Sequence, residues 1–137
     1  MFESKQFLFT SSAPVVTPKV YGVKIALGNS NPESALTYTD DAIGVTDWTI
    51  QPIFKDIKPC LLKNGVVQYY LNPNDFSKKL DGTDSDITNG NDGDVMIEIP
   101  KFAYMLYNDG TYQYVKITNN TNAQSIDSRF HYYAHTR

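Results

Sequence analysis

Short runs of alternating apolar and polar residues dominate the hydrophobic pattern of this chain. The clearest run leaves an Asp/Asn/Gly-rich loop and continues through Val95, Met96, Ile97, Glu98 and Ile99, which places the odd-numbered residues on one face of a strand. Such alternation is typical of an antiparallel strand with one buried face. We therefore expect antiparallel β structure in the middle of the protein.

A first hairpin is predicted over residues 60–71. Its centre is Asn64-Gly65, a dipeptide that readily supplies the two positive φ angles of a type I′ turn. β-forming residues flank the turn on both sides, which is the pattern of two strands joined by a tight turn.

A second hairpin is predicted to join residues 95–107 to residues 111–118 through Asn108-Asp109-Gly110. In this arrangement the segment 92–102 is a core element that pairs with the second arm of the hairpin. Pro100 has no N–H to donate, so it places that strand at a sheet edge or a bulge.

The remaining elements are short. Further strands are predicted over residues 20–27, 34–39 and 129–134, and short helical turns over 39–44 and 72–80. In the second helical turn Asn72 would be the N-cap and Pro73 the first helical residue. The predicted fold is mainly β: an antiparallel sheet or sandwich built from hairpins, with one or two short helical turns and an extended N-terminal arm.

The arm covers residues 1–20, and residues 21–137 form the predicted single β domain. An incomplete C-terminus of this domain is the alternative that we leave open. Pro14 and Pro18 disfavour a regular helix in the arm. An extended apolar arm either packs on a partner or forms an edge strand of its own domain. The candidate docking residues are Phe7, Phe9, Val15 and Val16.

Composition narrows the function classes. The chain is 41% hydrophobic, which is enough for a real core, and its net charge of −3 argues against nucleic-acid binding. No signal peptide and no apolar stretch of membrane-spanning length occur, so we expect synthesis in a cytoplasm and no membrane insertion. Cys60 is the only cysteine, which rules out an intrachain disulfide.

An Asp-rich loop over residues 81–94 is the candidate metal site. Carboxylates of this kind are hard oxygen ligands for Ca²⁺, but the spacing departs from that of an EF-hand, because Ile99 stands where the final Glu should be. Turn formation is the alternative role that we favour for these acids. The candidate ligands are Asp84, Asp86, Asp92 and Asp94.

Aromatic residues are the candidate binding groups. Exposed rings stack on sugars and add a hydrogen bond from the hydroxyl, although core or interface packing is the alternative for each of them. The candidates are Trp48, Tyr104, Tyr112 and Tyr114. His131 and His135 are too few for a zinc site. Nucleophile-elbow, phosphate-loop, zinc-protease and dinucleotide motifs do not occur, so we expect a protein that is not an enzyme.

Two blocks, Ile57–Phe76 and Gly90–Phe102, resemble tail-fibre and minor structural tail proteins of phages and prophages of Gram-positive bacteria. Thr37–Ala42 is a weaker third match, and the similarity extends over residues 21–118. Members of that family are longer and continue into a larger, lectin-like domain, so this chain is either a short version or part of a longer polypeptide.

The resemblance implies a virion protein of the tail or baseplate that contributes to host attachment without catalysis. It also implies partners among other tail proteins and a homo-oligomer, with a trimer favoured, and a host cell-surface glycan as a further partner. Two alternatives stay open: a carbohydrate-binding module that recognises cell-surface glycans, and a cell-wall polysaccharide hydrolase domain.

Overall fold

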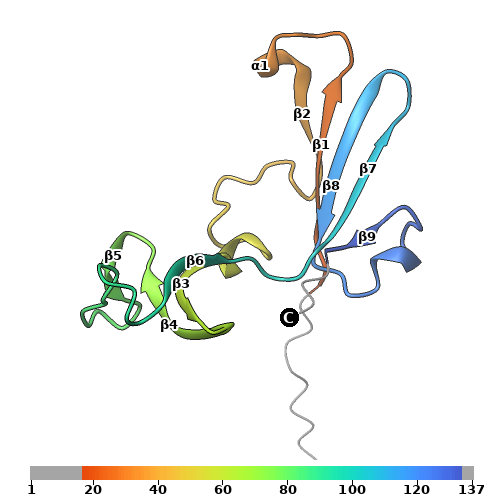
Figure 1. Cartoon of the computed structure of the whole chain (residues 1–137). Coiled ribbons are helices and arrows are strands. Elements are labelled where there is room, and N and C mark those ends of the chain that lie inside the picture. Colours follow the sequence, from red (N-terminus) through yellow and green to blue (C-terminus); the bar gives the residue numbers. More distant parts are fainter. Residues whose placement is uncertain (1–16, 134–137) are drawn as a thin grey trace, which may run out of the picture.

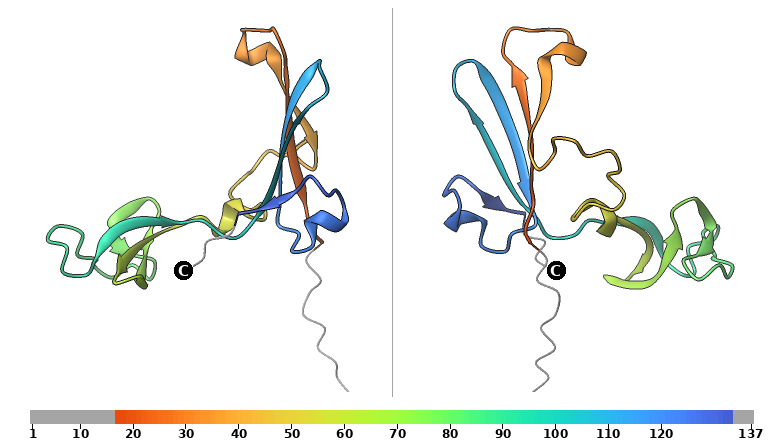
Figure 2. Two further views of the ribbon diagram at one scale, coloured as in Figure 1. Left: turned by 45° about the vertical axis from the view of Figure 1, so that its right-hand side comes forward. Right: turned by 180° about the vertical axis from the view of Figure 1, so that it is seen from behind.

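The computed structural model describes residues 17–133, which form two antiparallel sheets. The larger sheet has the order β2-β1-β8-β7-β9 and the smaller sheet the order β5-β4-β3-β6. Figure 1 shows the smaller sheet to one side of the larger one, and the views in Figure 2 agree. The predicted fold, mainly antiparallel β with short helical turns, is confirmed.

The larger sheet contains β1 (Val20–Ala26), β2 (Leu36–Asp40), β7 (Ala103–Asn108), β8 (Tyr112–Thr118) and β9 (His131–Tyr132). The smaller sheet contains β3 (Lys58–Lys63), β4 (Val66–Asn72), β5 (Asp75–Lys79) and β6 (Asp94–Glu98). The helical elements are α1 (Pro32–Ala35) and the 3₁₀ turns η1 (Phe54–Asp56) and η2 (Ala123–Ser125). Within residues 17–133 no helix is long and apolar enough to cross a membrane.

Most of the predicted arm, including Phe7, Phe9, Val15 and Val16, lies outside the described residues. The described chain enters β1 through Lys19, whose backbone N–H donates to the side-chain oxygen of Asn119 at 2.8 Å. This contact fixes the start of β1 beside the end of β8.

The first predicted hairpin is confirmed. β3 and β4 pair in antiparallel register, and the connecting residues Asn64 and Gly65 have φ angles of 52° and 76°. Both turn residues therefore have the positive φ angles that a type I′ turn requires.

The helix predicted over residues 72–80 is wrong. These residues form a second tight turn and β5, which pairs with β4 through Leu71 and Lys79. The side chain of Asn72 accepts a hydrogen bond from the N–H of Asn74 at 2.9 Å, so it closes a turn rather than capping a helix. An Asn produces the same local sequence signal in both roles.

The predicted partner of the central strand is also wrong. β6 pairs with β3, with Met96 opposite Cys60, whereas β8 pairs with β7 and β1. The chain crosses from one sheet to the other between β6 and β7, so only the part of the second hairpin that begins at Ala103 is found. Alternation predicts a strand and its faces, but it carries no information on the partner.

β6 lies at the edge of the smaller sheet, as Pro100 had indicated, but it is not a core element. The side chains of Val95, Ile97 and Ile99 are 41%, 50% and 45% exposed. In the smaller sheet the buried residues are instead Pro59, Cys60, Leu61 and Leu71.

The larger sheet has different coverings on its two faces. On one face Met105 and Phe130 form a buried cluster with Ala103 and Ala123, beneath the segment that carries η2 and β9. The other face carries the side chains on the Tyr21 side of β1 and is covered in part by residues 41–57. Figure 1 shows this segment leaving β2 and leading to the smaller sheet.

Candidate functional site

An aromatic pocket of about 260 Å³ lies on the Tyr21 face of the larger sheet. Strand register places its floor, because Tyr21 is opposite Ile117 and Val23 is opposite both Val115 and Tyr38. Residues 41–57 supply the remaining wall. The lining residues are Tyr21, Gly22, Val23, Tyr38, Ala42, Trp48, Phe54, Val115 and Ile117.

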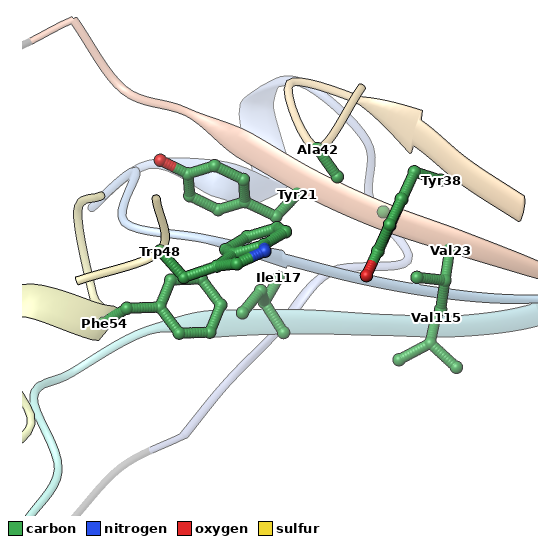
Figure 3. Close-up of a pocket in the computed structure, with 9 residues that line it drawn as sticks. Tyr21, Val23, Tyr38, Ala42, Trp48, Phe54, Val115 and Ile117 are labelled. Atoms are coloured by element: carbon green, nitrogen blue, oxygen red, sulfur yellow. The ribbon is translucent and has the colours of Figure 1, made fainter. Parts of the chain in front are cut away.

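Trp48 is the centre of an aromatic cluster at one end of this pocket (Figure 3). Its ring centroid lies 4.8 Å from that of Phe54 and 5.5 Å from that of Tyr21, both in edge-to-face geometry. Tyr38, 5.9 Å from Trp48, lies at the other end beside Val23 and Val115 and is 48% exposed. Edge-to-face contacts of this kind hold the rings in fixed relative positions.

Asp41 connects the segment 41–57, which covers the pocket, to the first strand of the sheet. Its carboxylate accepts hydrogen bonds from the N–H of Val20 at 2.8 Å and from the ammonium of Lys19 at 3.2 Å, and its own N–H donates to the Val20 carbonyl at 2.8 Å. The backbone hydrogen bond from Val20 is the main reason that the pKa of Asp41 is lowered, with the Lys19 contact adding to it. The pocket wall is thus tied to the first residues of β1.

Tyr21 is the most buried ring of the pocket, with only 4% of its surface exposed. Its hydroxyl donates to the side-chain carbonyl of Gln51 at 3.1 Å. Burial, and secondly the charge of Asp41, raise the pKa of Tyr21 above its ordinary value of 10.0, and the phenol is neutral at pH 7. The pocket therefore presents a neutral, apolar surface.

Ile53, the residue before η1, has a strained backbone conformation. Its φ of 74° lies in the left-handed region, where a β-branched residue is a true outlier. The side chain is buried, which offsets a backbone cost of about 1–3 kcal/mol. This turn starts η1 and so directs Phe54 toward Trp48.

The other predicted binding aromatics do not join Trp48 in one site. Tyr112 and Tyr114 lie on the opposite face of β8, where Lys24 covers the ring of Tyr112 and Tyr107 stacks on Tyr114 at 4.5 Å. Tyr104 lies beside His131, 5.8 Å between ring centroids, and does not line the pocket. Only Trp48 among the four is a pocket residue.

Of the four candidate ligands in the polar loop, only Asp86 has the turn role that we favoured from the sequence. Asp86 accepts hydrogen bonds from the N–H and hydroxyl of Thr88, at 3.2 and 3.0 Å. Asp92 accepts from the hydroxyl of Tyr69 at 2.7 Å, and Asp84 pairs with Lys78. Asp94 lies in β6 opposite Leu62. Over the part of the chain that the structure describes, no three His, Cys, Asp or Glu side chains are grouped to hold a metal ion.

Sequence reasoning identified Trp48 but missed Tyr21, Tyr38 and Phe54. The first two lie in strands, and Phe54 follows an irregular stretch, so the only signal was that four aromatics occur within residues 21–54. Their convergence depends on the β1–β8 register and on the turn at Ile53.

Comparison of the chain with protein-family models, with curated proteins and with solved structures found no match. The arrangement itself is suited to binding an apolar group, because its walls are aromatic and aliphatic. A sugar site combines aromatic rings with several hydrogen-bonding groups, so this pocket favours an apolar side chain over a glycan.

Proposed function

We propose that this chain is a non-enzymatic structural component of a phage tail or baseplate, which assembles with copies of itself and with other tail proteins. In this role it is part of the virion and contributes to host attachment by holding or connecting the receptor-binding apparatus. A trimer is the favoured assembly.

The support is the way in which the two blocks that resemble tail proteins combine. Ile57–Phe76 supplies β3, β4 and the start of β5, and Gly90–Phe102 supplies β6, so both blocks belong to the smaller sheet. Side chains also join them: the hydroxyl of Tyr70 donates to Glu98 at 2.7 Å, and that of Tyr69 to Asp92. The two main blocks therefore form one sheet, whereas the weaker match Thr37–Ala42 begins in β2 of the larger sheet.

The balance of buried and exposed apolar residues supports the assembly. Among the described residues eleven apolar residues are buried, whereas eighteen large apolar residues are exposed. Contiguous exposed apolar surface marks interaction sites, and Val95, Met96, Ile97 and Ile99 form such a run in and just after the edge strand β6. The exposed residues occur on both sheets, for example Leu106 on β7 and Met96 on β6.

Electron microscopy of particles tests the proposal. Phage particles from the strain that encodes the chain would be purified and labelled with an antibody against the chain, with an antibody against the capsid as the positional control. Label on the tail is the expected result. The proposal fails if the chain is absent from particles and sediments alone as a monomer of 15.5 kDa.

A further inference from the structure

The size and chemistry of the Trp48 pocket indicate what occupies it. Its volume of about 260 Å³ is below the range of roughly 300–1,000 Å³ that small-molecule sites have. Its walls are aromatic and aliphatic side chains, and none of the lining residues carries a charge at neutral pH. One or two apolar side chains of a polypeptide match this space.

The chain carries such side chains just before the pocket. Phe7 and Phe9 precede Tyr21 by 14 and 12 positions, and the described chain begins at Thr17. The eight residues from Phe9 to Thr17 span at most about 28 Å, which is the reach of this length of chain from the sheet that carries the pocket. Lys5 adds charge complementarity, because Asp47 is exposed directly beside Trp48.

Proline placement directs this segment toward a neighbour. Pro14 and Pro18 favour extended backbone at the residues that precede them. β1 runs forward past the pocket from Tyr21 to Val23, so extended backbone before Val20 leads away from it and would have to turn back to enter the pocket of its own chain. A second copy of the chain presents the same pocket without that reversal.

We propose that Phe7 and Phe9 of one copy insert into the Trp48 pocket of a neighbouring copy. The exchange of N-terminal segments is then the contact that holds copies together. This inference rests on the proposed self-assembly but does not depend on a tail function.

Trp48 provides the readout, because it is the only Trp of the chain. The full-length protein and the variant F7S/F9S would be compared by acrylamide quenching of Trp48 and by sedimentation, with F2S as the matched control. We expect F2S to behave as the unaltered chain. Each lost Phe should weaken self-association about tenfold to a hundredfold and leave Trp48 more accessible to quencher.

A mixing experiment separates insertion between copies from insertion within one chain. The F7S/F9S chain, which keeps Trp48, would be mixed with a Trp48→Phe chain. The second chain keeps Phe7 and Phe9 but has no Trp fluorescence. Protection of Trp48 on mixing is the expected result. Absence of protection overturns the exchange. If F7S/F9S still assembles with unchanged quenching, self-assembly stands and the inference falls.

Discussion

Replacing Gly93 by Ala should destabilise the smaller sheet far more than an ordinary loop substitution. An alanine Cβ at this position would lie 2.4 Å from the carbonyl oxygen of Leu62 and 2.7 Å from the carbonyl carbon. These are backbone atoms of β3, and β3 is held there by its pairing with Asp94 in β6. Neither strand can move away from Gly93 without breaking hydrogen bonds between β3 and β6.

The cost has two parts. The φ of 119° at Gly93 is one that Ala adopts only with a strain of about 1–3 kcal/mol. Opening one or two ladder hydrogen bonds costs about 1 kcal/mol each. We therefore expect a loss of about 2–5 kcal/mol, a large part of the roughly 5–15 kcal/mol that stabilises a typical domain.

Urea denaturation followed by far-UV circular dichroism measures this loss, and Gly90→Ala is the matched control. Gly90 also has a positive φ, 71°, but an alanine Cβ there would meet no atom within 4 Å, so about 1 kcal/mol is expected. Trp48 emission reports on the larger sheet in the same samples. Equal losses for the two variants would refute the close contact between Gly93 and Leu62.

Three further outcomes follow from the hydrogen bonds and pKa shifts. Tyr69→Phe removes the donor to Asp92 and should cost about 1–3 kcal/mol in urea denaturation, and an unchanged midpoint would contradict a role in joining the two blocks. The pKa of Tyr21 is raised above 10.0 in the folded protein, so its contribution to the free energy of unfolding is complete below pH 10.0 and is lost as pH rises through the raised value. The fall in melting temperature at alkaline pH should therefore be smaller in Tyr21→Phe than in the unaltered chain. The hydrogen bonds from Arg129 lower the pKa of Asp127 to about 2, so the contribution of this carboxylate to the free energy of unfolding is present above pH 3.8 and is lost as pH falls toward 2. Arg129→Gln should return the pKa of Asp127, measured by NMR, toward 3.8.

Local turn chemistry was the part of the fold that the sequence predicted best. Asn64 and Gly65 specify their hairpin because few residue pairs tolerate two positive φ angles. The helix predicted to begin at Asn72 was wrong because an N-cap and a turn use the same side-chain hydrogen bond. The choice between them was made by the pairing of β5 with β4, which is a tertiary contact.

The sheet partners and the pocket could not be predicted from local patterns. The alternation at Val95 and Ile97 is the same whether β6 joins β3 or β8, and both faces proved to be exposed. Trp48 was identified as an aromatic without a known partner, because its contact with Tyr21 depends on the 41–57 segment returning to β1. The resemblance to tail proteins predicted a function, and the structure adds that its two blocks share one sheet.

The pairing of β1 with β8 has a consequence for the order of folding. Val20 meets Thr118, about 100 positions away, whereas the smaller sheet is assembled wholly from the intervening residues. Closing so long a loop costs less entropy once its interior is already compact. During synthesis the smaller sheet therefore forms first, and the edge of β1 that pairs with β8 stays open until β8 emerges. In that interval a neighbouring nascent chain can pair with the same strand edge.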